Sequence, residues 1–123
     1  MLLKDFYKVE KTKKLSEGKY KTLVRLNNQH EIFKGHFPGN PVTPGVCMMQ
    51  IIKELTQEIT GFSLMLKSSS NVKFMALINP DETPDLVLDL DIIFTEDDLV
   101  KVKNTTSFGE TVALKLSNVY KKI

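Results

Sequence analysis

His36 lies in a segment rich in glycine and proline, which runs from residue 35 to 46 and is written GHFPGNPVTPGV. Such a segment cannot form a regular strand or helix, so it holds the imidazole in a loop. A histidine side chain titrates near neutral pH and can therefore remove a proton from a neighbouring group. The segment is a candidate for acid–base chemistry.

The same segment leads into a predicted helix. Thr43 can serve as the N-cap, and Pro44 fits the first helical position, where a missing N–H costs nothing. The pattern of residues 46–59 predicts a helix that ends near Gly61. The N–H groups of a first helical turn are unpaired and can hold a polarised carbonyl oxygen, and Gly45 has no side chain to block that approach.

A base beside such donors is what proton abstraction next to a carbonyl requires. A second interpretation stays open at this point. The prolines can simply stiffen a loop in which His36 bonds only to its neighbours.

The helix itself changes character along its length. Residues 46–52 are apolar nearly all round, which predicts burial on most sides, and Gln50 is the only polar side chain among them. Residues 53–58 carry Lys53, Glu54, Gln57 and Glu58, so this half is expected to reach the surface.

Strand-like alternation occurs before and after this helix. Residues 19–26 alternate apolar and charged side chains, and so do residues 85–92, with further strands predicted around 72–76, 100–102 and 112–116. Short loops separate the later strands, which favours antiparallel pairing. The order predicts an α+β fold, a single domain over residues 1–123 with one helix against one antiparallel sheet.

The composition excludes several classes of protein. Of the 123 residues, 26% are charged with a net charge of +2, too little to indicate nucleic-acid binding. No apolar run could span a membrane and no signal peptide is evident, which indicates a cytoplasmic protein. Cys47 stands alone, so no internal disulfide forms. Neither a phosphate-binding loop nor metal-ligand spacing is present, and no cofactor is expected.

The string HFPGNPVTPGV resembles the signature of the 3-hydroxyacyl-[acyl-carrier-protein] dehydratases, H-F-P-G-x-P-(V/I)-x-P-G-(V/C). Weaker similarity extends from about residue 20 to 120, through Val72-Lys73-Phe74 and the turn Asn79-Pro80-Asp81. The resemblance implies a hot-dog fold, in which an antiparallel sheet wraps around one central helix. It also implies dimers whose sheets join side by side, with acyl tunnels along the interface.

The resemblance further implies residue roles. His36 matches the base that removes the C2 proton, Gly45 the backbone N–H that polarises the thioester carbonyl, and Val42 the carbonyl that orients the imidazole. Substrate contacts are then expected from residues around these positions: Phe37, Pro38, Val42, Val46 and Met49. In the family, a glutamate or aspartate fourteen residues after the histidine protonates the departing hydroxyl, and it comes from the other protomer.

Gln50 stands at that acid position. A primary amide donates hydrogen bonds but gives up no proton near neutral pH. Losing a general acid costs about 10²- to 10⁴-fold in rate. A core glutamine whose bonds are satisfied is the plainer interpretation of the same residue.

Three other groups could replace the acid. Glu54 lies one turn further along the same helix face and could act through a water, whereas Glu31 and His30 are expected at the surface. A heterodimer is the stronger possibility. His36 of this chain would then meet the acid of a related subunit that keeps its glutamate or aspartate.

The sequence therefore predicts a dehydratase-like protein that acts on 3-hydroxyacyl thioesters of acyl carrier protein or coenzyme A and forms trans-2-enoyl thioesters. The alternative is a non-catalytic subunit that binds acyl thioesters and completes a site in a heterodimer. A thioesterase on the same fold is a third hypothesis, which the HFPG string does not favour.

Several residues have plain structural interpretations. Met48 and Met49 fit core filling as well as an acyl tunnel, and Cys47 fits inert packing. Asp85, Asp89 and Asp91 alternate as on a solvated strand face rather than in a metal cluster. The lysine-rich stretches at 8–21 and 121–122 fit solvated faces or attraction to an acidic partner such as acyl carrier protein.

Overall fold

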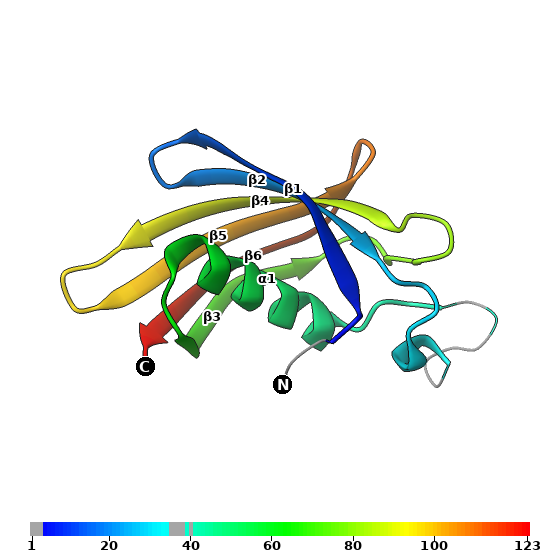
Figure 1. Ribbon diagram of the computed structural model, residues 1–123, viewed down its shortest axis with the longest axis horizontal. Helices are drawn as coiled ribbons and strands as arrows, with labels where there is room; N and C mark the ends of the chain where they lie inside the picture. Colours follow the sequence, from blue (N-terminus) through cyan, green and yellow to red (C-terminus); the bar gives the residue numbers. More distant parts are fainter. Residues whose placement is uncertain (1–3, 35–38, 40) are drawn as a thin grey trace.

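The computed structural model describes residues 4–34, 39 and 41–123. In chain order the elements are β1 (Tyr7–Ser16), β2 (Lys19–Leu26), the short 3₁₀ helix η1 (Glu31–Phe33), α1 (Gly45–Thr60), β3 (Leu64–Phe74), β4 (Asp85–Phe94), β5 (Leu99–Phe108) and β6 (Thr111–Lys122) (Figure 1). Residues 35–38 of the candidate loop lie outside the described residues, and so do the predictions made for them.

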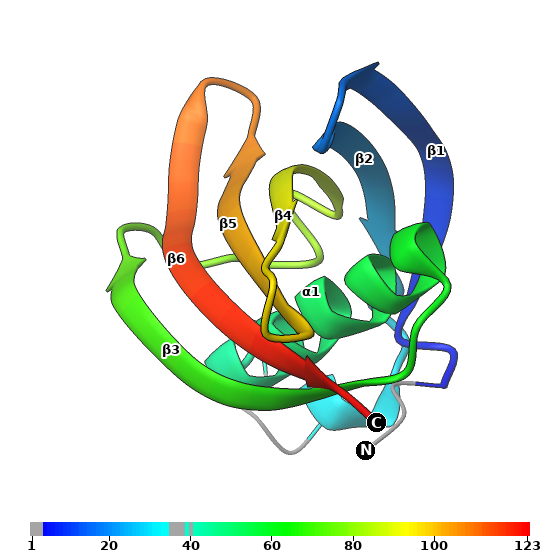
Figure 2. The same cartoon turned by 90° about the vertical axis from the view of Figure 1, so that its left-hand side faces the viewer.

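All six strands form one sheet in the order β1-β2-β4-β5-β6-β3, and every neighbouring pair is antiparallel. The sheet curves strongly, and α1 lies within the curve (Figure 2). The predicted α+β plan, with one helix against one antiparallel sheet, is confirmed, and two strands precede the helix while four follow it.

The core forms between the inner face of the sheet and one side of α1. Strand β4 shows the expected period of two, because alternate side chains are buried: Leu86, Leu88, Leu90 and Ile92. From α1 the core receives Ile51, Ile52 and Leu55. Burial of these apolar side chains removes them from water and fixes the helix against the sheet.

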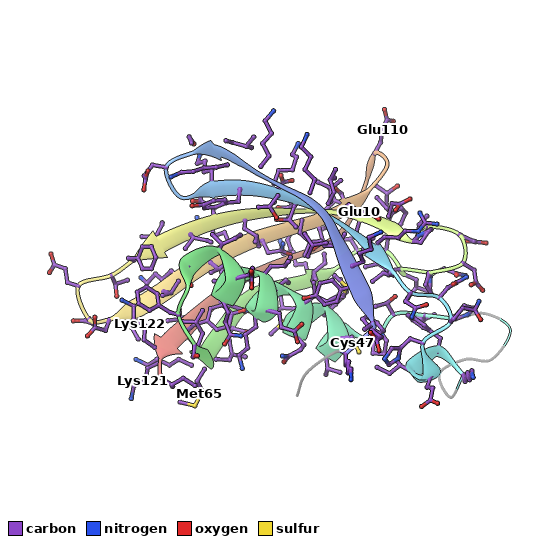
Figure 3. The ribbon with its side chains drawn as sticks, viewed as in Figure 1. Glu10, Cys47, Met65, Glu110, Lys121 and Lys122 are labelled. Atoms are coloured by element: carbon purple, nitrogen blue, oxygen red, sulfur yellow. The ribbon has the colours of Figure 1, made fainter. Side chains whose placement is uncertain are left out.

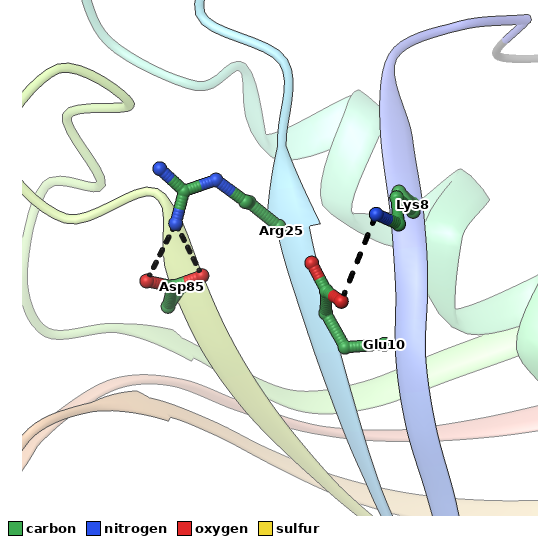
Figure 4. Close-up of polar contacts among 4 residues, drawn as sticks. All are labelled: Lys8, Glu10, Arg25 and Asp85. Carbon is green, nitrogen blue, oxygen red and sulfur yellow. Dashed lines mark hydrogen bonds and ion pairs between the residues drawn. The ribbon is translucent and has the colours of Figure 1, made fainter.

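The outer face of the sheet is charged. Asp85, Asp89 and Asp91 alternate with the buried leucines of β4, and their register partners on β2 are Arg25, Lys21 and Lys19. Arg25 Nη1 lies 2.9 Å from Asp85 Oδ2, and Figure 4 shows this ion pair. The carboxylates therefore lie beside a row of cations on β2, on the face opposite the buried leucines, which agrees with the predicted solvated face.

The two edge strands differ in chemistry. Strand β1 is charged and exposed along almost its whole length. Strand β3 buries only Leu64, yet it exposes apolar side chains: Met65, Leu66, Val72 and Phe74. Figure 3 shows Met65 projecting away from the sheet. The strand predicted near 72–76 thus begins eight residues earlier, at Leu64, and ends at Phe74.

The expectations about α1 meet different outcomes. Pro44, not Thr43, is the N-cap, because Pro44 is extended (ψ 143°) and its carbonyl accepts from Cys47 N at 3.0 Å. The Thr43 hydroxyl makes no capping bond within the described residues. The first half of the helix is largely buried, as predicted, although Val46 is 69% exposed. The predicted end is confirmed, because Gly61 caps the helix in the left-handed region (φ 78°), which glycine adopts without strain.

Candidate functional site

A pocket opens at the N-terminus of α1, between the helix start and the chain that follows β3. Its volume is about 490 Å³, within the usual range for small-molecule sites. Apolar side chains line most of it, among them Val42, Val46, Met48, Phe74 and Leu77. The pocket thus combines an apolar wall with the end of a helix at which backbone N–H groups have no helical partner.

Gly45 is the first residue of α1 and lies in the wall of this pocket. A Cβ atom added at Gly45 would come 2.8 Å from Cζ of Phe74, closer than carbon atoms approach. The absence of a side chain therefore leaves room for the ring of Phe74. The first N–H groups of an α-helix have no helical partner and can hold a carbonyl oxygen or an anion, so the role of the Gly45 N–H stays a prediction.

The loop before the helix is tied to the segment after β3. Thr43 N donates to the carbonyl of Ile78 at 2.8 Å, which closes one wall of the pocket. The Thr43 side chain is 7% exposed, and its hydroxyl has no hydrogen-bond partner in the part of the chain that the structure describes. The hydrogen bond between Thr43 and Ile78 was not evident from the sequence, since the two residues lie 35 positions apart.

The predicted site residues meet different outcomes. Val42, Gly45 and Val46 line the pocket together, and their roles stay predictions. Met49 lies outside it and packs partly buried against the core. His36, Phe37 and Pro38 lie outside the described residues. Their roles stay predictions.

Gln50 lies elsewhere on the helix, in a polar cluster with Tyr7 and Glu54. Its Nε2 donates to Glu54 Oε2 at 2.9 Å, and the Tyr7 hydroxyl donates to Glu54 Oε1 at 2.8 Å. Gln50 is half-buried and is absent from the lining of the pocket at Gly45. Within one chain, Gln50 is therefore separate from the pocket at Gly45, and its role at the acid position stays a prediction.

Tyr7 is the member of this cluster that the sequence did not reveal. It comes from β1, 47 residues before Glu54. Burial raises the pKa of the Tyr7 hydroxyl well above its usual range, and the hydrogen bond to Glu54 and the charges of Glu54 and Glu58 raise it further. Tyr7 therefore stays a protonated donor at neutral pH. No local pattern marks such a contact between a strand and a distant helix.

The other singled-out residues are structural. Cys47 is 3% exposed, and burial raises the pKa of its thiol, so it fits the predicted inert packing. His30 was expected at the surface but is half-buried: its Nδ1 accepts from Ile32 N at 3.1 Å and its Nε2 bonds to the carbonyl of Lys4 at 3.0 Å. His30 therefore caps the N-terminus of η1 with one ring nitrogen and contacts the backbone of Lys4 with the other. Glu31 is exposed, as predicted.

Residues 4–34, 39 and 41–123 contain neither a candidate metal site nor a candidate membrane-spanning helix. No group of three or more His, Cys, Asp or Glu side chains there could hold a metal ion. No helix in the same part of the chain is long and apolar enough to cross a membrane.

Comparison with known proteins gives a family match and related dehydratases. The family model ApeI-like, described as ApeI dehydratase, matches residues 10–113. The 3-hydroxyacyl-[acyl-carrier-protein] dehydratase FabZ of Levilactobacillus brevis is 27% identical over 85% of this chain and 75% of its own length. FabZ of Clostridium acetobutylicum is 29% identical over 85% of this chain and 74% of its own.

Solved structures share the fold. The dehydratase heterocomplex ApeI:P from Xenorhabdus doucetiae has a TM-score of 0.64 at 20% identity, over 93% of this chain and 95% of that one. A hypothetical thioesterase with coenzyme A from Streptococcus pneumoniae has a TM-score of 0.67 at 12% identity, over 95% and 85%. These likenesses confirm the predicted hot-dog fold.

Proposed function

Because the chain belongs to the ApeI-like family, whose model is that of the ApeI dehydratase, we propose that it binds 3-hydroxyacyl thioesters and takes part in their dehydration to trans-2-enoyl thioesters. The observation that carries the proposal is the apolar pocket at the start of α1, with Gly45 in its wall. An acyl chain fits such a wall, and a helix N-terminus stabilises the negative charge that develops on the thioester oxygen.

His36 is the proposed base. It stands nine residues before Gly45 in the same loop, and the string around both residues resembles the signature of the 3-hydroxyacyl-[acyl-carrier-protein] dehydratases. The imidazole would remove the C2 proton while the Gly45 N–H holds the thioester oxygen. The carrier is acyl carrier protein or coenzyme A. The L. brevis and C. acetobutylicum relatives are named as dehydratases of acyl-carrier-protein substrates.

The acid step is where this chain departs from the mechanism. Gln50 cannot protonate the leaving hydroxide, and hydroxide leaves poorly without a proton. Glu54 is close, but both of its carboxyl oxygens are already engaged, one by Gln50 and the other by Tyr7. We therefore propose that the chain alone turns over slowly.

A partner subunit resolves the difficulty. Strand β3 is an edge strand with exposed apolar side chains, so it is the proposed edge for a homodimer or heterodimer. In a heterodimer with a relative that keeps its glutamate or aspartate, His36 would meet that acid across the interface. The similarity to the structure named the dehydratase heterocomplex ApeI:P supports this proposal.

The test is turnover of a 3-hydroxyacyl thioester by the purified chain and by its Gln50→Glu variant. We expect the variant to gain about 10²- to 10⁴-fold in rate, because it regains a general acid. Gln29→Glu is the matched control, since it adds the same charge at an exposed loop residue. His36→Ala should abolish the gain.

The other results discriminate the alternatives. Equal turnover by both proteins would contradict the role proposed for residue 50. Turnover that needs an added acid-bearing relative would establish the heterodimer. Hydrolysis of the thioester without formation of an enoyl product would indicate a thioesterase instead.

A further inference from the structure

The hydrogen bonds around Glu54 determine which end of the Gln50 amide faces which way. A carboxylate offers only acceptor oxygens, so the group that contacts Glu54 Oε2 at 2.9 Å must be the NH₂ of Gln50. The carbonyl oxygen of the same planar amide then points away from Glu54. A free glutamine could turn over by rotation about its last bond, but this one cannot do so without breaking a charge-assisted hydrogen bond.

Tyr7 holds the carboxylate from its other side. Its hydroxyl donates to Glu54 Oε1 at 2.8 Å, so the two oxygens of Glu54 are occupied by donors from β1 and from α1. The contact joins the sheet edge to the helix and restricts the rotation of the Glu54 side chain. Tyr7 and Gln50 thus both donate to Glu54, and these two hydrogen bonds together hold the Gln50 amide.

We propose that Glu54, held by Tyr7, is a positioning residue that turns the Gln50 carbonyl oxygen toward the ligand, so that the site prefers thioesters bearing a 3-hydroxyl group over the matching thioesters without one. The inference rests on the proposed function, since that function places residue 50 beside the acyl chain. It goes further by assigning an acceptor where the family has an acid.

The physical reason is complementarity of donor and acceptor. A 3-hydroxyl can donate to an amide oxygen, whereas a saturated chain has no group to offer and would leave the oxygen unpaired. One such hydrogen bond changes affinity by about three- to tenfold. An enoyl thioester also lacks the donor, so the same acceptor would favour the hydroxylated ligand over its dehydrated product.

The test is a titration with a matched ligand pair, 3-hydroxyoctanoyl-coenzyme A and octanoyl-coenzyme A. Each protein also carries His36→Ala, which removes the proposed base so that no ligand is consumed. We expect this background to bind the hydroxylated ligand about three- to tenfold more tightly. Added Glu54→Gln should bring the ratio close to one, because an amide at this position accepts or donates and no longer selects one orientation of Gln50.

Two variants make the result specific. Glu58→Gln removes the same charge one turn further along α1, on an exposed residue, and should keep the preference. Tyr7→Phe leaves the carboxylate but removes the donor to one of its oxygens, so we expect an intermediate ratio. Glu58→Gln should also leave the affinity for octanoyl-coenzyme A unchanged, and an unchanged unfolding transition in every variant would exclude a general loss of structure.

Equal binding of the two ligands by the background protein, or a preference that survives Glu54→Gln, would overturn the inference and leave the proposed function standing. Failure to bind either thioester would remove the proposed function and this inference with it.

Discussion

Ile51 and Gln50 are neighbours in the sequence but face different sides of helix α1. Ile51 is completely buried between the helix and the sheet, whereas Gln50 is half-buried and bonds to Glu54. The side of the helix that carries Ile51 is apolar and stabilises the fold. The side that carries Gln50 is polar, and its hydrogen bond to Glu54 orients the Gln50 amide. The difference teaches that one helix can serve both needs, because residues one position apart point about 100° apart around its axis.

The largest expected effect separates the two sides by stability. Ile51→Ala should lower the free energy of unfolding by about 2–5 kcal/mol, because it leaves a cavity in the core. Gln50→Ala should lower it by only about 0.5–1.5 kcal/mol, the value of one hydrogen bond. Urea denaturation of both variants measures the contrast, and equal losses would mean that Gln50 is part of the core rather than of a site.

The next effect concerns the pocket at the start of the helix. Gly45→Ala would bring a methyl group to 2.8 Å from the tip of the Phe74 ring, so the ring must move. We expect acyl-thioester affinity to fall about tenfold, since overpacking of a close contact costs about 1–3 kcal/mol. Phe74→Leu in the same protein should restore part of the affinity. Unchanged affinity in Gly45→Ala would place the ligand outside this pocket.

The polar side can be tested through pH. In Gln50→Glu the introduced carboxyl lies beside the Glu54 carboxylate, and two like charges at that distance raise the pKa of the introduced group. Its acid form then persists to higher pH, and turnover falls as pH rises through that pKa. Adding Glu54→Gln should move the falling limb of the rate profile about one pH unit lower. A profile that does not move would show that the two groups do not interact.

The smallest effect concerns Tyr7. Tyr7→Phe should lower the free energy of unfolding at neutral pH by about 0.5–1.5 kcal/mol, because it removes the bond to Glu54. The raised pKa of Tyr7 stabilises the fold below pH 10, and this contribution is lost above pH 10, where the unfolded tyrosine ionises but the folded one does not. Stability measured from pH 9 to 12 should therefore fall less steeply in the variant than in the parent.

Local patterns predicted most of the elements correctly. The alternation in residues 19–26 and 85–92 predicted β2 and β4, because a half-buried strand must place every second side chain in the core. Gly61 marked the end of the helix because few other residues adopt its backbone conformation without strain. In contrast, β3 shows no alternation that could have marked its start, since as an edge strand it buries only Leu64.

The cap of α1 shows how a local rule fails. Thr43 is a favourable capping residue, but its N–H is bonded to the carbonyl of Ile78, which holds it in the wall of the pocket. Pro44 therefore takes the cap position. The competing contact comes from a segment 35 residues away, so capping preferences alone could not predict it.

The sequence by itself determined the family, the order of the elements and the identity of the groups that could react, because each depends on residue type and on spacing along the chain. Tertiary structure alone decided which groups meet. It placed Phe74 over Gly45, and it brought Tyr7 to Glu54 and so oriented Gln50. The physical reason is that side-chain contacts between a strand and a helix depend on how the sheet curves around that helix, and no short stretch of sequence encodes that curvature.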